Sequence, residues 1–195
     1  YPLRRQRQMC IRDSYLIEAS PDISFQLNNF LKNESKNLDG IFITHAHIGH
    51  YSGLINLGRE VLNSSKTPLF LMPKMTEFIS KNGPWNQLVK LKNVDLKKIF
   101  NEKSIKLTEG LSIIPFRVPH RDEYSETVGF KIIGPKKSAL FIPDIDKWDK
   151  WDKSIKNLIT EVDYAFLDGT FYDSKEINNR DISEIPHPFI IESLE

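Results

Sequence analysis

The segment Thr44–Leu54, THAHIGHYSGL, places three of the chain's five histidines within six positions. The run GIFIT, which ends at Thr44, is short and apolar and is typical of a buried strand. Side chains at i and i+2 of a strand share a face, so we expect His45 and His47 to converge where it ends. A following helix would bring His50 to the same region. Gly49, which has no Cβ, is expected to supply a positive φ in the turn.

Three imidazoles directed at one point need a compensating group. A divalent cation would hold all three through bonds of ~2.0–2.1 Å. The alternative is that these are surface histidines of a loop, each satisfied by water or backbone. The spacing H-x-H-x-x-H directly after a buried strand favours the metal site.

Apolar periodicity predicts alternating helices and strands in the first half of the chain and clustered strands later. Helices are expected over 19–33, 54–62, 74–85 with a break at 82–84, and 148–159. Strands are expected over 40–44, 67–73, 111–120, 127–135, 138–145 and 162–169. This order indicates an α/β or α+β class.

Length and composition predict one domain, with 195 residues, 39% hydrophobic and 27% charged. No apolar run approaches the ~20 residues that a membrane helix needs, so we expect neither a membrane partner nor a membrane anchor. The single cysteine, Cys10, fits a reducing compartment and hence a cytoplasmic location. The oligomeric state stays open.

The first fourteen residues, YPLRRQRQMCIRDS, hold four of the eight arginines and leave the rest of the chain slightly acidic. An acidic body argues against nucleic acid as a partner. The segment lacks the apolar region of a secretory signal, and it can be a transit peptide or sequence foreign to the protein. We favour the last, and we expect residues 15–195 to be part of a longer domain cut at both ends.

The motif FITHAHIGHYSGL resembles the metallo-β-lactamase superfamily, in which a strand runs into T-H-x-H-x-D-H. More narrowly, it resembles the branch near pyrroloquinoline quinone biosynthesis protein B. The likeness extends through PFRVPHRDEYSETVGF, ALFIPDIDKWDKW and LDGTFYD. The resemblance implies an α+β fold, a four-layer αβ/βα sandwich with metal at one end of two facing sheets.

The resemblance also implies roles for individual residues. His45, His47 and His120 would form a first metal site, His50 would belong to a second, and Asp144 would bridge them. His50 and Asp144 are therefore also the catalytic candidates. The family's aspartate is replaced by Gly49, which favours one ion over two.

Further candidates lie later in the chain. The family's last histidine ligand is expected beyond Glu195, and His187 and Asp168 are possible additional site residues. Arg121, Tyr124 and Glu126, in the loop after His120, are candidates for binding a small-molecule substrate.

Three functions follow from these residues. The first is a metal-dependent hydrolase in which metal-activated water attacks an ester, amide, lactone or phosphodiester, with Asp144, Asp168 or Glu126 as base. Zinc is the expected ion, with iron or manganese as alternatives. The second is a non-haem iron oxygenase related to pyrroloquinoline quinone biosynthesis. The third is a non-catalytic binding protein whose loops are held by metal.

Overall fold

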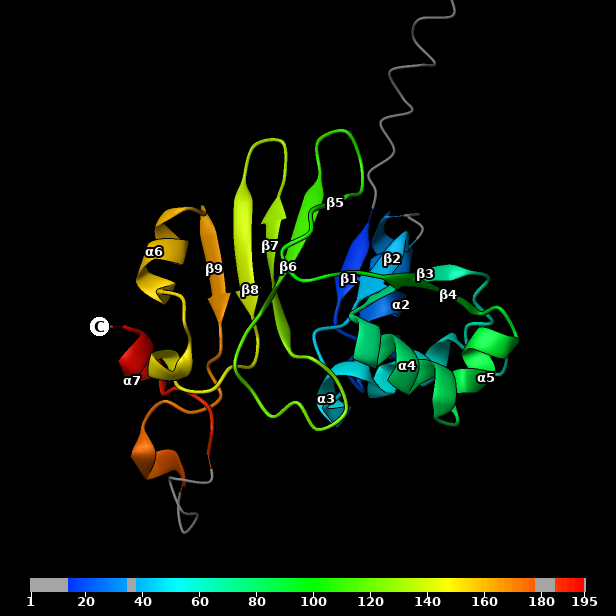
Figure 1. The fold of residues 1–195 in the computed structure, drawn as a ribbon. Helices are drawn as coiled ribbons and strands as arrows, with labels where there is room; N and C mark the ends of the chain where they lie inside the picture. Colours follow the sequence, from blue (N-terminus) through cyan, green and yellow to red (C-terminus); the bar gives the residue numbers. More distant parts are fainter. Residues whose placement is uncertain (1–13, 35–37, 178–184, 195) are drawn as a thin grey trace, which may run out of the picture. The chain divides into compact units, whose positions relative to one another are not determined.

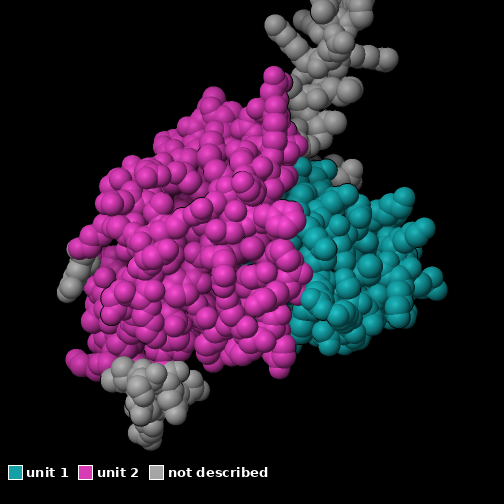
Figure 2. All heavy atoms as spheres, viewed as in Figure 1, with its two compact units in different colours: residues 1–71, 75–98 teal, residues 72–74, 99–195 magenta. Residues whose placement is uncertain are grey.

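The computed structural model describes residues 14–34, 38–177 and 185–194. The chain divides into two compact units, which Figure 2 colours separately. Unit 1 comprises residues 1–71 and 75–98, and unit 2 comprises residues 72–74 and 99–195. The arginine-rich head discussed above lies outside the described residues, except for Ser14.

Unit 1 is built on a four-stranded parallel sheet in the order β1-β2-β3-β4 (Figure 1). Its strands are β1 (Tyr15–Ile17), β2 (Gly40–Phe42), β3 (Thr67–Leu71) and β4 (Val94–Lys98). Its helices are α2 (Ile23–Glu34), α3 (Ile48–Tyr51), the 3-10 helix η1 (Ser52–Leu57), α5 (Trp85–Lys90) and α4 (Pro73–Lys81), of which the first two residues are counted with unit 2. Helices connect successive strands because parallel neighbours need a crossover.

Strand β2 is an inner strand of this sheet, which explains why its sequence is apolar throughout. Gly40, Ile41 and Phe42 are all buried, as expected for a parallel strand covered on both faces. The ring of Phe42 stacks on that of Phe70 in β3 with centroids 4.2 Å apart. The histidine segment begins at Thr44, two residues after this strand, so its start is fixed by the core.

Unit 2 contains a five-stranded sheet in the order β5-β6-β7-β8-β9. Its strands are β5 (Ile105–Lys106), β6 (Ser112–Arg117), β7 (Val128–Ile133), β8 (Ser138–Ile142) and β9 (Tyr164–Leu167). The pairs are antiparallel except β8 with β9, which the 3-10 helix η2 (Trp148–Lys150) and α6 (Ile155–Thr160) connect. The 3-10 helix η3 (Ser174–Ile177) and α7 (Ile190–Ser193) complete the unit (Figure 1).

One core cluster of unit 2 lies on one face of this sheet. Leu140 and Ile142 of β8 are fully buried and pack with Trp151, while Leu158 of α6 covers the same cluster. Burying two such side chains stabilises the unit by roughly 3–6 kcal/mol. This packing fixes the end of β8, from which the segment carrying Asp144 leaves the sheet.

The expected mixture of sheets and helices is confirmed, and most predicted strands lie where they were expected. The helix expected over 54–62 is wrong. Helix α3 ends at Tyr51 and the following η1 ends at Leu57, while Val61 is 59% exposed. The pattern across Leu54 and Leu57 continued by chance into a solvated turn. The stripe over 148–159 is likewise split, because η2 ends before Ser154, which caps α6 by accepting from the Asn157 N–H.

None of the helices in the described part of the chain has the length and apolar character needed to cross a bilayer.

Candidate functional site

The three clustered histidines lie together in unit 1. The ring of His45 is 4.5 Å from that of His47 and 4.2 Å from that of His50, measured between centroids. His45 Nε2 and His47 Nδ1 are 2.9 Å apart. Two nitrogens bound to one tetrahedral zinc ion would lie roughly 3.3 Å apart, so this pair needs to open by only a few tenths of an ångström.

The ring of His45 is in contact with the hydroxyl group of its neighbour Thr44. Thr44 Oγ1 lies 2.8 Å from His45 Nδ1, and the His45 side chain is buried with the residue only 1% exposed. If Nδ1 donates to this hydroxyl, the unprotonated nitrogen is Nε2, the atom that faces His47. Such orienting contacts are typical of histidines that bind metal.

Gly49 does not have the role predicted for it. It lies inside α3, and no glycine among the described residues has a positive φ. A Cβ built at Gly49 meets no atom within 4 Å. The expectation of a strained turn was wrong because the chain enters the helix already at Ile48, where ordinary helical geometry suffices. An aspartate would therefore fit sterically at this position.

Glu18 is a residue of this region that the sequence did not reveal. It has φ of 73°, a left-handed conformation that costs a non-glycine residue about 1–3 kcal/mol. Its Oε1 accepts a hydrogen bond from the Thr44 N–H at 2.9 Å, and its Oε2 lies 3.0 Å from His50 Nδ1. Burial raises the pKa of Glu18, and the contacts with His50 and Thr44 only partly oppose this effect.

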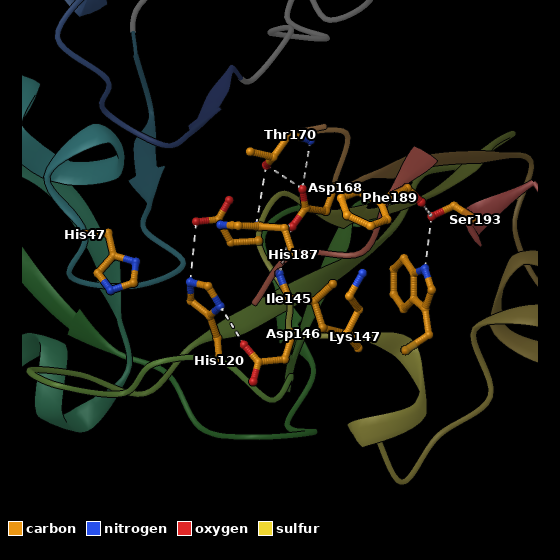
Figure 3. A network of polar contacts seen from close by, with 12 residues as sticks. His47, His120, Ile145, Asp146, Lys147, Asp168, Thr170, His187, Phe189 and Ser193 are labelled. Carbon is orange, nitrogen blue, oxygen red and sulfur yellow. Dashed lines mark hydrogen bonds and ion pairs between the residues drawn. The ribbon is translucent and has the colours of Figure 1, made fainter. Parts of the chain in front are cut away.

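Unit 2 contributes a second group of ligand-type side chains, shown in Figure 3. The His120 side chain is fully buried, and its Nε2 lies 3.7 Å from Asp144 Oδ2. Its Nδ1 lies 3.3 Å from Asp146 Oδ1, and the Asp146 N–H donates to the Pro119 carbonyl at 2.7 Å. His120 thus lies between two carboxylates of one short segment, which orient both ring nitrogens.

Asp168 and His187 form a tight pair beside this group (Figure 3). His187 Nδ1 lies 2.6 Å from Asp168 Oδ2, and the rings of His187 and His120 have centroids 5.4 Å apart. Ligand atoms of Asp144, Asp168 and His187 all lie within 4.8 Å of one another. Although burial by itself lowers the pKa of His187, the hydrogen bond and charge of Asp168 outweigh it and hold that pKa above its usual value.

The acceptor capacity of Asp168 is already used. Its Oδ1 accepts from the Thr170 N–H at 3.1 Å and from Thr170 Oγ1 at 2.6 Å. Its Oδ2 accepts from the Ile145 N–H at 3.2 Å as well as facing His187. A carboxylate offers about four lone-pair sites, and four donors fill them here. Asp168 is therefore better suited to orient His187 than to bind an ion directly.

The segment after β8 ties this site to the end of the chain. Lys147 Nζ lies 2.8 Å from Glu192 Oε2 and 3.9 Å from the centroid of the Phe189 ring. Trp148 Nε1 donates to Ser193 Oγ at 2.9 Å (Figure 3). These contacts hold residues 185–194, and with them His187, against residues 145–148.

The three predicted substrate-binding residues differ in their surroundings. Arg121 is exposed and close enough to His187 for its charge to lower the pKa of that imidazole. Tyr124 is 66% exposed. Glu126 accepts from the Lys74 N–H at 3.0 Å, which gives it a structural role at the start of α4.

A cleft of about 620 Å³ lies within unit 2 and reaches His120. Its charged lining residues are largely paired: Arg117 contacts Asp122 at 2.7 Å, and Lys153 contacts Glu102. Because these charges are already compensated, the cleft has no strong preference for an anion or a cation.

Sequence reasoning missed Glu18 and Asp146. Asp146 was not among the candidates, yet it contacts His120. Its signal was its position two residues after Asp144. Glu18 carries no comparable signal apart from following an apolar strand.

The structure resembles several solved structures. Zinc-bound PqqB from Methylobacterium extorquens matches with a TM-score of 0.66 and 20% identity over 84% of this chain and 58% of that one. A diphosphatase of the PhnP family matches with a TM-score of 0.60 and 20% identity over 92% of this chain and 62% of that one. Human tRNase Z, short form, matches with a TM-score of 0.59 and 16% identity over 92% of this chain and 75% of that one.

At these identities the likeness concerns the fold alone. The chain spans less than two thirds of the length of the first two structures. No curated protein sequence matches it. The sequence does match the beta-lactamase superfamily domain over residues 14–193, which is nearly its whole length. The chain therefore belongs to the beta-lactamase superfamily.

Proposed function

We propose that the protein is a metal-dependent hydrolase of a small-molecule ester, amide, lactone or phosphodiester. The observation that carries this proposal is the group His120, Asp144, Asp168 and His187 in unit 2. Ligand atoms of Asp144, Asp168 and His187 lie within 4.8 Å of one another, and His120 Nε2 lies 3.7 Å from Asp144 Oδ2. Buried imidazoles and carboxylates held in this way are typical of catalytic sites.

We assign the ion to His45 and His47 of unit 1 together with His120 and Asp144 of unit 2. Imidazole nitrogens and one carboxylate suit zinc, and they also suit iron or manganese. His50 is assigned to a second ion that Asp144 would share. When bound, a divalent metal lowers the pKa of a coordinated water from about 15.7 toward ~7 and polarises the substrate's oxygen.

The Asp168–His187 pair supplies the proton chemistry in this proposal. Asp168 holds a proton at His187 Nδ1, so a protonated imidazole can donate from Nε2 to the leaving group. The raised pKa of His187 keeps a larger fraction of it protonated near neutral pH. Asp168 acts through His187 and is a positioning residue.

Arg121 and Tyr124 are proposed to orient the substrate, because both are exposed in the loop that follows His120. Glu126 is a weaker candidate for substrate or base, since its carboxylate already accepts from the Lys74 N–H.

The test uses purified protein loaded with zinc or manganese and a panel of ester, lactone, amide and phosphodiester substrates. His120→Ala should lose metal, measured by elemental analysis, and also lose turnover. His187→Gln should lose turnover but keep its metal. Asp95→Asn, at an exposed ion pair with Lys97, is the matched control. Turnover that does not depend on metal, or no turnover of any substrate class, would refute the proposal.

A non-haem iron oxygenase is the second candidate. The observation in its favour is Gly49, since a one-ion site needs no carboxylate there. Oxygen uptake by protein loaded anaerobically with iron, without metal-dependent hydrolysis, would favour this function. A non-catalytic protein would bind metal in the same residues and show neither reaction.

A further inference from the structure

The cleft of unit 2, with a volume of about 620 Å³, has the size of a small-molecule binding site. Of the described residues assigned above to the metal and proton chemistry, only His120 lines it. Lys150 also lines it and contacts Asp146 Oδ2 at 3.3 Å, while Asp146 Oδ1 faces His120 Nδ1 (Figure 3). The cleft is therefore connected to the proposed site through Asp146, but its lining is largely its own.

Glu102, which lines this cleft, has an uncommon backbone conformation. Its φ of 57° is left-handed, which glycine adopts at lower cost than glutamate. The Glu102 N–H donates to the Pro115 carbonyl at 2.7 Å, which fixes this turn against β6. Residues held in such conformations are found at ligand-binding sites, where the side chain is needed at that position.

Arg117 supplies a positive charge in the same cleft from a fixed backbone. Its N–H donates to Asn101 Oδ1 at 2.8 Å, and its carbonyl accepts from Trp151 Nε1 at 3.1 Å. Its side chain is 55% exposed and contacts Asp122 Oδ2 at 2.7 Å. Asp122 Oδ1 accepts from the Thr127 N–H at 3.0 Å, so Asp122 keeps a partner when the guanidinium turns to a ligand.

The carboxylates on the other side of the charge balance are also accessible. Glu102 is paired with Lys153, and their side chains are 56% and 36% exposed. Exposed ion pairs of this kind contribute little to stability, so a ligand can replace one partner at low cost. Asp152 lines the cleft as well, and it has no hydrogen bond or ion pair with any described residue.

The lining therefore offers both signs of charge around an apolar surface. Three acidic and three basic side chains line the cleft, together with Val118 and Trp151, which are 3% and 8% exposed. A ligand with a single charge would match only half of this lining. A ligand that carries both charges and an apolar group matches all of it.

We propose that this cleft binds a small dipolar molecule that carries an ammonium and a carboxylate group, either a free amino acid or a short peptide. Glu102 and Asp152 accept from the ammonium group. The planar guanidinium of Arg117 donates to both oxygens of the carboxylate. The apolar group lies against Trp151. The inference does not depend on the proposed metal chemistry, because none of these residues is assigned to the ion.

The first experiment titrates the metal-free protein with leucine and, separately, with glycylleucine, followed by isothermal titration calorimetry. The two compounds carry the same groups at different separations, so the tighter one identifies the source. Each is compared with its N-acetyl form, which lacks the ammonium group, and with its amide, which lacks the carboxylate. The tighter of the two should bind roughly 10-fold better than either blocked form, because each blocked form loses one charge-assisted contact.

The second experiment assigns the two charges to residues. Glu102→Gln should remove the preference over the N-acetyl form and keep the preference over the amide. Arg117→Gln should do the opposite. A merely structural role would weaken both preferences together in each variant. Asp95→Asn, at the exposed ion pair with Lys97 in unit 1, is the control and should change neither preference.

The outcomes separate this inference from the proposed function. No binding of leucine or glycylleucine at millimolar concentration, or equal binding of charged and blocked forms, would overturn it. Equal loss of both preferences in each variant would overturn the roles of Glu102 and Arg117. If a variant does not fold, the wild-type comparison decides, since it needs no substitution. A protein that binds the dipolar compound but no metal would refute the proposed function and support this inference.

Discussion

Replacing Asp168 by asparagine tests how unit 2 holds its site together. The side chain is fully buried, and four donors surround its two oxygens. Asparagine has nearly the same shape but carries an NH₂ group in place of one oxygen. In either orientation of the amide, that NH₂ group meets a backbone N–H, at Ile145 or at Thr170.

The cost follows from these contacts. Removing one partner of a buried ionic pair destabilises a protein by about 3–5 kcal/mol, because the remaining donors lose their acceptor. For a chain of this size, that loss lowers the melting temperature by roughly 6–20 °C. We therefore expect Asp168→Asn to be among the more destabilising conservative changes in unit 2.

Urea unfolding of the metal-free protein, followed by tryptophan fluorescence, is a suitable assay because Trp148 and Trp151 both lie in unit 2. Asp95→Asn, an exposed carboxylate paired with Lys97 in unit 1, is the control and should not change the transition. If Asp168→Asn lowers the free energy of unfolding by less than about 1 kcal/mol, the reasoning is refuted. It would mean that water or a local shift satisfies the four donors.

Three further predictions concern single residues. Gly49→Asp should increase the number of ions bound per chain, measured by elemental analysis, and should raise apo stability by a few tenths of a kcal/mol because aspartate is a better helix former than glycine. A drop in stability would mean that the position is not open. Gly53→Ala should destabilise unit 1 by about 1–3 kcal/mol in chemical unfolding, since its Cβ would lie 2.1 Å from the Ser20 carbonyl oxygen; unchanged stability would contradict this packing. Because the pKa of His187 is raised on folding, its contribution to stability is complete below the unfolded value of about 6.5 and is lost as the pH rises through the folded value. The difference in unfolding free energy between wild type and His187→Gln should therefore shrink from pH 6 to pH 9, and a difference that grows would show the opposite shift.

The sequence predicted the parts of the site that depend on local periodicity. The separation of His45 and His47 by two residues at the end of a strand places both rings together, and the following turn adds His50. Asp144 was expected from the family resemblance, and the structure places it just after strand β8 and beside His120. The grouping of the three histidines needs only the regular geometry of strands and helices.

The remaining features depend on contacts between distant segments. Glu18 lies 26 positions before Thr44, and its role arises from a left-handed backbone that no local pattern indicates. Asp146 lies 26 positions after His120, so no local pattern connects the two residues. His187 and Asp168 were expected only as possible additional site residues, and their pairing was not predicted because it spans 19 residues.

The short segment after β8 has a consequence for how this protein can diverge. Asp144 and Asp146 face His120, the Ile145 side chain enters the apolar core, and Lys147 contacts Glu192. Side chains therefore alternate between the His120 side and the core side of this segment. Inserting or deleting one residue would exchange the two sides, which would bury a charge in the core and place an isoleucine against the imidazole. Related chains should therefore differ here by substitution while keeping the same number of residues, and length changes should accumulate in the loops on either side.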